Sequence, residues 1–182
     1  MDVKEAIGKR RAYRNLEPAE IDEETVEELA RAAQLAPSCF NNQPWNYVFI
    51  YEKEQLERMH DALSSGNAWA KKASLIIAVF SKQDDDCVVA DRTYNLFDTG
   101  LGTSSMILRA TEMGLVAHPI AGFSQKKTRN ILGIPEEYQV IALVIVGKFA
   151  GLEGGDGENR EHDSMRPERK GLDEFVHHNR YG

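Results

Sequence analysis

Cationic side chains are concentrated near the start of a chain that is acidic overall. Lys9, Arg10, Arg11 and Arg14 lie close together, whereas the whole chain has 22 Lys and Arg against 29 Asp and Glu and a net charge of −7. Guanidinium groups stay ionised and donate paired hydrogen bonds to phosphate oxygens. This cluster suits a phosphate monoester, although a solvated basic turn at the end of a short helix would have the same composition.

A second candidate segment lies between Pro37 and Pro44. The two prolines restrict the backbone, and the residues between them carry a hydroxyl and three amides, Ser38, Asn41, Asn42 and Gln43. Amides and hydroxyls offer uncharged donors and acceptors that can read the edge of a heteroaromatic ring. Ordinary turn chemistry is the alternative interpretation.

A third candidate segment runs from residue 118 to residue 123 and contains Pro119 and Gly122. Because glycine has no side chain, backbone amides at this point could approach a flat ligand closely. A plain structural corner would also explain the pattern.

Several other patterns argue against familiar sites. Gly100 and Gly102 are not followed by the third glycine of a dinucleotide fingerprint, and the three aspartates at 84–86 lack the spacing of a calcium loop. Cys39 has no base that the sequence can name. The two cysteines, Cys39 and Cys87, are too few for a disulfide framework, and they lack the further Cys or His ligands of a zinc site. We therefore expect no metal and a reducing compartment.

Length and composition predict one domain spanning residues 1–182. The chain is 42% hydrophobic and 28% charged, which is enough apolar material for a core. The acidic balance argues against a nucleic-acid partner. No apolar stretch is long enough to cross a membrane and the start lacks a signal-peptide pattern, so the sequence predicts no membrane association and a cytoplasmic location.

Periodicity predicts the elements that position these segments. The expected helices are 2–9, 22–35, 53–63, 94–115 and 124–132, with Asp22 and Ser124 as N-caps. The expected strands, short and rich in β-branched residues, are 46–51, 75–80 and 140–149. The segment 151–165 is predicted to be a flexible, acidic, glycine-rich loop. An apolar triplet in 166–182 predicts a tail that docks on another surface.

In order and spacing, these segments resemble the FMN-dependent nitroreductase family, and the resemblance covers most of the chain. The matching motifs are Arg10 to Arg14, the Pro-Ser-x-x-Asn-x-Gln-Pro-Trp run at 37–45, Asp98-x-Gly100, Pro119 to Gly122, Leu132 to Pro135, and the late Arg169-Lys170.

The resemblance implies an α+β fold with a central mixed, mostly antiparallel sheet flanked by helices. It also implies a homodimer that builds two FMN sites across its interface. Arg10 and Arg11, beside Ala12, would bind the phosphate and ribityl chain, with Arg169 or else Lys170 or Arg166 adding a tail contact. Arg14 and Asn67 would contact the pyrimidine edge of the flavin.

The remaining site residues are assigned by the same resemblance. Pro37, Ser38, Cys39 and Asn41 would come from the second subunit and cover the flavin ring. Pro119, Ile120, Ala121 and Gly122 would pack beside flavin N5. Two positions depart from the family pattern, because Ala12 replaces a frequent serine and Ala121 replaces a glutamate of larger members.

The implied activity is an oxidoreductase reaction that uses no catalytic side chain. NADH or NADPH would deliver hydride to flavin N5, and a nitroaromatic, a quinone or a similar small acceptor would then be reduced. A flavin-dependent reductive dehalogenase or flavin-modifying enzyme on the same scaffold is an alternative, as is a non-catalytic flavin-binding protein. The short 81–91 segment offers little for the substrate lid that the dehalogenase alternative needs.

Overall fold

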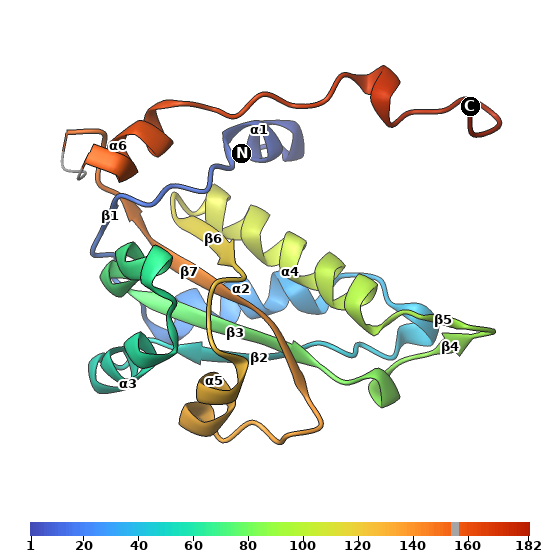
Figure 1. The fold of residues 1–182 in the computed structure, drawn as a ribbon, viewed down its shortest axis with the longest axis horizontal. Coiled ribbons are helices and arrows are strands. Elements are labelled where there is room, and N and C mark those ends of the chain that lie inside the picture. Colours follow the sequence, from blue (N-terminus) through green and yellow to red (C-terminus); the bar gives the residue numbers. More distant parts are fainter. Residues whose placement is uncertain (154–156) are drawn as a thin grey trace.

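The computed structural model describes residues 1–153 and 157–182 and has an antiparallel sheet at its centre (Figure 1). The strand order is β1-β7-β3-β2, and β6 also pairs with β7. The strands are β1 (Leu16–Glu17), β2 (Asn46–Ile50), β3 (Leu75–Ser81), β6 (Val116–Ile120) and β7 (Gln139–Phe149). Among the described residues, the strand pairs of this sheet are antiparallel, which agrees with the expected mostly antiparallel sheet.

Both faces of this sheet are covered, because successive residues of a strand point to opposite sides. In β3, Leu75, Ile77 and Val79 belong to one hydrophobic cluster, whereas Ile76 and Ala78 belong to another. All five side chains are at most 1% exposed. This double burial explains why β3 appears in the sequence as a continuous apolar run without alternation.

Helices form the layers on either side of the sheet (Figure 1). The helices α2 (Glu23–Gln34) and α4 (Asn95–Glu112) pack on one face, and α3 (Lys53–Met59) and α5 (Gln125–Leu132) cover the other. The second face is completed by the 3₁₀ segments His60–Ala62 and Ser65–Lys72. The helix α1 (Val3–Lys9) lies against α4.

Local capping fixes the ends of these helices where the sequence predicts them. Asp2, Asp22 and Ser124 each accept a hydrogen bond from a backbone N–H in the first turn of α1, α2 and α5. Gly114 and Gly133 follow α4 and α5 with φ values of 77° and 69°. Such left-handed backbone favours glycine and ends a helix.

The long helix α4 is buried along much of its length, but Leu96 and Phe97 near its start are 47% and 64% exposed. No helix among the described residues combines the length and apolarity required to cross a bilayer.

The segment 151–165 is also not the continuous loop that was predicted. Residues Gly157–Ser164 form helix α6, and residues 154–156 of the predicted loop lie outside the described part of the chain. The physical reason is a tertiary contact. Asp163 of α6 is 4% exposed and accepts a hydrogen bond from the backbone N–H of Arg14. A helix with a weak sequence signal can be stabilised by such contacts.

The last residues extend away from the body of the protomer (Figure 1). The tail contains the 3₁₀ segment Leu172–Glu174, and Leu172 and Phe175 are 71% and 56% exposed. The apolar residues predicted to dock therefore find no partner surface within the described part of this protomer.

The two cysteines correct the sequence interpretation. Cys39, in the 3₁₀ segment Cys39–Asn41, is joined to Cys87 by a disulfide, with Cα atoms 6.1 Å apart. The segment around Cys87 contains the 3₁₀ turn Gln83–Asp85 and a small hairpin of β4 (Val88–Val89) and β5 (Arg92–Thr93). Sequence alone gave these cysteines no partners because a separation of 48 residues hides their contact in the fold. The pairing removes the cysteine-based support for a reducing compartment.

Candidate functional site

The arginine loop, which we define as residues 10–14, connects α1 to β1 and forms the basic centre of the site. Arg10, Arg11, Arg166 and Arg169 line one pocket of about 220 Å³ together with Ala12. Burial lowers the pKa of Arg10, and the charges of Arg169, Arg166 and Arg11 lower it further. Within the described residues neither Arg10 nor Arg169 forms an ion pair. The pocket thus has excess positive charge that an anion would neutralise.

Asp163 of α6 holds the arginine loop in place. Its carboxylate accepts hydrogen bonds from the backbone N–H of Arg14 at 3.0 Å and from that of Asn15 at 2.8 Å, and it contacts His162 Nδ1 at 2.9 Å. These are charge-assisted hydrogen bonds in a buried setting, where they are strongest. Arg14 and the following residue therefore depend on a helix nearly 150 positions away in sequence.

The side chains of the arginine loop contribute further anchoring. Arg11 donates to the carbonyl oxygens of Asp163 and Met165, at 3.2 and 2.7 Å, and lies over the ring of Tyr13. Tyr13 in turn stacks on Phe149, with ring centroids 3.8 Å apart. Arg11 is thus committed to positioning the tail, so Arg10 is the better placed of the two to meet an anion.

His118 in β6 contacts the same loop. Its Nδ1 lies 3.2 Å from the carbonyl oxygen of Tyr13, and its ring stacks on Trp69 at a centroid distance of 4.7 Å. Burial lowers the pKa of His118, and the nearby charge of Arg14 contributes in the same direction. A neutral ring that donates from Nδ1 to the carbonyl fits these surroundings.

Asn67 contacts both Gly122 and Trp69. Asn67 Nδ2 donates to the carbonyl oxygen of Gly122 at 2.9 Å, and Trp69 Nε1 donates to Asn67 Oδ1 at 3.2 Å. A Cβ added at Gly122 would collide with Asn67 Nδ2 and lie 2.7 Å from Ser64 Oγ. A larger residue would force the ends of these two side chains to move, so glycine suits this close approach.

Arg14 lies next to the 3₁₀ segment that carries Asn67 and Trp69. It lines a pocket of about 510 Å³ with Ser65, Gly66 and Trp69 from the 3₁₀ segment 65–72. Its Nε is buried and has no hydrogen-bond partner in the described part of the chain. A buried donor without a partner is costly, so this atom is suited to an acceptor that arrives with a ligand.

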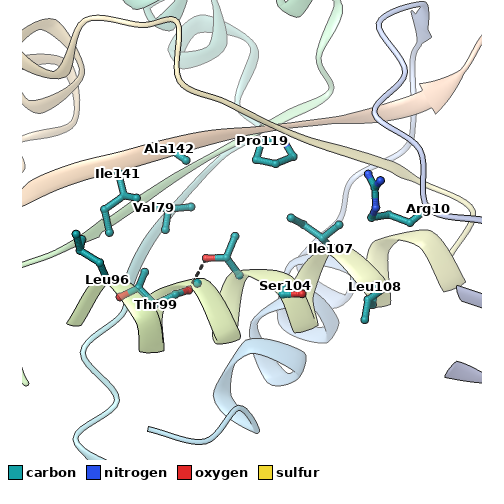
Figure 2. A pocket seen from close by; sticks show the side chains of 12 residues that line it. Arg10, Val79, Leu96, Thr99, Ser104, Ile107, Leu108, Pro119, Ile141 and Ala142 are labelled. Carbon is teal, nitrogen blue, oxygen red and sulfur yellow. Dashed lines mark hydrogen bonds between the residues drawn. The ribbon is translucent and has the colours of Figure 1, made fainter. Parts of the chain in front are cut away.

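An apolar pocket of about 400 Å³ lies between α4 and the sheet (Figure 2). Arg10 closes one end, Leu96 lies at the other, and Pro119 lies above Ile107. Thr99 lines this pocket, and its hydroxyl is buried without a partner among the described residues. Most of the lining is aliphatic, so the pocket suits an apolar or aromatic body next to a charged end.

The segment Pro119–Gly122 is only partly available to a ligand. Ile120 is 7% exposed and packs in a core cluster, so its side chain does not face a pocket. Any contact from Ile120 must come from its backbone. Ala121 is exposed, and the Gly122 carbonyl is already used by Asn67.

The amide loop, defined as residues 37–43, lies apart from these groups within one chain. Pro37, Ser38, Cys39 and Asn41 line none of the three pockets just described. Phe40, Asn41 and Gln43 have φ values of 49°, 60° and 51°, which side-chain-bearing residues rarely adopt. The loop is held by a bond from Cys39 N–H to Asp98 Oδ2 at 2.6 Å and by the disulfide.

The sequence did not indicate the positioning roles of Asp163, His118 and Trp69, although His118 begins the third candidate segment. Asp163 lies in an acidic run without periodicity, so no local signal distinguishes it. The Asn67-x-Trp69 spacing is a usable signal, because a tryptophan two positions away can donate to the amide. Arg166, named only as an alternative to Arg169, joins it in the same pocket.

Comparisons with known proteins identify the family and the fold. The Nitroreductase family model matches residues 7–74 and 65–148. An Archaeoglobus fulgidus protein provisionally named NADH dehydrogenase/NAD(P)H nitroreductase is 27% identical over 144 residues, which cover 76% of this chain and 80% of that protein.

Two solved structures share the fold. One, described as an oxidoreductase containing FMN, has a TM-score of 0.89 and 24% identity over 100% of this chain and 94% of that one. The other, a provisional nitroreductase of Exiguobacterium sibiricum in complex with FMN, has a TM-score of 0.82 and 21% identity over 98% of both chains. The family match covers well over half of the sequence, so the chain belongs to the nitroreductase family of oxidoreductases.

Proposed function

We propose that this protein is an FMN-dependent oxidoreductase that takes hydride from NADH or NADPH and reduces a small acceptor such as a nitroaromatic or a quinone. The observation that carries the proposal is the convergence of Arg10, Arg166 and Arg169 on one pocket. The carboxylate that also lines it, Asp163, is already bonded to the backbone N–H groups of Arg14 and Asn15. Two solved structures with this fold contain FMN, which supports the same cofactor here.

The residues present fit a flavin mononucleotide in three respects. The arginine pocket offers fixed positive charge for a phosphate. The aliphatic pocket beside α4 begins at Arg10 and includes Pro119, so an aromatic body could continue from the phosphate end. The orphaned Nε of Arg14 would gain an acceptor at the polar edge of that body.

The chain would bind the flavin, orient it and polarise its ring, while bound FMN would supply the hydride chemistry. Arg10 and Arg169 would hold the phosphate. Arg14 would place a cation at the pyrimidine edge, where it favours the negative charge of the reduced state. Asn67, oriented by Trp69, would fix the neighbouring backbone at Gly122.

The active unit is proposed to be a homodimer. The amide loop lines none of the three site pockets within one chain, yet it presents a strained backbone and an 85% exposed Phe40. The exposed Leu96 and Phe97 of α4 and the exposed tail are further unpartnered apolar surfaces. A second copy would cover these surfaces and bring its amide loop over the cofactor.

A spectrum of the purified protein tests the proposal directly. We expect flavin absorbance, released as FMN on denaturation, that bleaches under anaerobic NADH or NADPH and returns when a quinone or nitroaromatic is added. Protein that is colourless and does not take up added FMN would refute the proposal. Reduction no faster than that of free FMN would favour a non-catalytic flavin-binding protein.

The variant Arg10→Ala tests the phosphate assignment. Loss of one charge-assisted contact should weaken FMN binding by about 2 kcal/mol, or roughly 30-fold in Kd. The matched control is Lys9→Ala, because Lys9 is exposed and bonded to Glu5 instead. Equal effects of the two substitutions would show that Arg10 acts only through general charge.

A further inference from the structure

The Cys39–Cys87 disulfide joins two segments with different roles. Cys39 belongs to the amide loop, whereas Cys87 lies just before the β4–β5 hairpin. Both residues are half-buried rather than enclosed in the core. The disulfide therefore clamps the loop proposed to cover the flavin to a segment outside the cofactor contacts.

Two acids lie directly behind the disulfide. Asp98 is 2% exposed and accepts from Cys39 N–H at 2.6 Å, while Asp86 is 9% exposed and accepts from Cys87 N–H at 2.7 Å. Asp86 Oδ2 is buried and has no hydrogen-bond donor within the described part of the chain. Each backbone amide of the disulfide is thus held by its own carboxylate.

The two acids are close enough to influence each other. Burial raises the pKa of Asp98, and the adjacent Asp86 raises it further. Asp86 also lies next to the disulfide, because one of its carboxylate oxygens and the sulfur atoms of Cys39 and Cys87 all lie within 4.8 Å of one another.

The amide loop has few other restraints. Gln43 N–H donates to Ser38 Oγ at 2.9 Å, and Asn42 Nδ2 donates to Asp86 Oδ1 at 3.3 Å. Three left-handed residues make this conformation costly. The disulfide is the one covalent restraint that opposes relaxation of the loop.

We propose that Cys39–Cys87 is a reversible thiol–disulfide switch, set by small-molecule thiols, that controls how tightly the amide loop closes over the cofactor. The inference rests on the proposed flavin function. In the oxidised state the loop is clamped in its strained conformation. In the reduced state it is free to relax, and the flavin exchanges faster.

The chemistry balances with two thiols as the reductant. A thiolate attacks Cys87 Sγ, which forms a mixed disulfide and releases Cys39 as a thiolate that takes a proton from water. A second thiol then attacks the small-molecule sulfur and frees Cys87. Two electrons pass to the protein, and the small molecule leaves as its own disulfide.

The chain contains only two cysteines, so thiol titration reads the switch without ambiguity. We expect none per chain after treatment with oxidised glutathione and two after reduced glutathione. In FMN-loaded protein, the rate of flavin release, followed by fluorescence, should rise about tenfold on reduction, because only part of the stabilisation from a disulfide acts locally on the loop.

The variant Cys87→Ser provides the matched control, since Cys87 is outside the proposed flavin contacts. Its flavin release should equal that of the reduced protein and should not respond to thiols. Two free thiols that oxidised glutathione cannot join would overturn the proposal. So would release rates that agree within twofold between the two redox states.

A separate readout distinguishes this inference from the proposed function. Hydrogen exchange at residues 39–43 needs no flavin, and reduction should accelerate it in the wild type but not in Cys87→Ser. Protein that binds no FMN but shows this change would refute the function and retain the switch. Unchanged exchange would refute the switch.

Discussion

The arginine loop and the amide loop are both irregular segments suited to ligand binding, yet they are stabilised in different ways. The arginine loop is embedded in its own chain through the buried Asp163 and the stacked pair Tyr13 and Phe149. The amide loop is exposed, left-handed at three non-glycine positions and held mainly by one covalent bond and Asp98. The first is anchored by contacts within this chain, whereas the second leaves Phe40 85% exposed.

This contrast teaches how preorganisation is distributed over the site. Cations brought together in a single chain repel one another, so tight anchoring is needed before the anion arrives. A loop that contributes uncharged amides carries no such repulsion and can remain adjustable. Four substitutions test whether the two loops differ in this way.

The largest effect is expected from Asp163→Ala. Its removal leaves the buried amides of Arg14 and Asn15 without acceptors, so we expect a loss of about 3 kcal/mol in the free energy of unfolding. Urea denaturation measures this loss. The control is Glu161→Ala on the same helix, whose side chain is exposed. A loss below about 1 kcal/mol would show that α6 does not anchor the arginine loop.

The next largest effect is expected from Gly122→Ala. The new Cβ would displace Asn67 from the position that Trp69 fixes, at a cost of about 2 kcal/mol by analogy with overpacked cores. Thermal unfolding and FMN titration should both report it. Gly66→Ala is the matched control for the unfolding measurement, because no heavy atom lies within 4 Å of its added Cβ. Similar effects at both glycines would contradict the close-packing argument.

A smaller effect of about 1 kcal/mol is expected from Phe40→Gly. Glycine relieves the left-handed strain but removes the exposed ring that we expect the second subunit to cover. Subunit association, measured by sedimentation, should weaken roughly fivefold. Ala90→Gly relieves a similar φ of 58° in the β4–β5 turn and should leave association unchanged. If Phe40→Gly associates as tightly as the wild type, Phe40 is not an interface residue.

The smallest effect concerns pH and His118. Burial lowers the folded-state pKa of His118 below its ordinary value of 6.5. Its contribution to stability is therefore complete above about 6.5 and is lost as the pH falls towards the folded value. His118→Phe retains a ring against Trp69 and should flatten the fall in melting temperature between about pH 6.5 and 5. An unchanged slope would show that another group causes the acid sensitivity.

Several parts of the fold could be predicted because their causes are local. Asp22 and Ser124 cap helices through backbone groups three residues away, and Gly133 ends α5 through its own dihedral angles. The continuous apolar run of β3 reflects burial on both faces. The arginine loop was identified as basic for the same kind of reason, since charge composition does not depend on packing.

Contacts between distant residues could not be predicted in this way. Asp163 lies in an acidic segment without periodicity, and its role appears only when α6 packs beside residues 14 and 15. The cysteines are 48 positions apart, and Ile120, in a motif typical of ligand binding, turns its side chain into the core. Local sequence patterns carry no information about which distant segments pack together.

By itself, the sequence determined the helices α1 to α5, three of the strands, the excess of positive charge near the start and the order of motifs that marks the family. The tertiary structure decided which arginines share a pocket, that Arg11 holds the tail, and that the amide loop is bound covalently to the segment around Cys87. The physical reason is the range of the interactions. Capping and periodicity act over a few residues, whereas charge convergence, close packing at Gly122 and disulfide pairing exist only after the chain has folded.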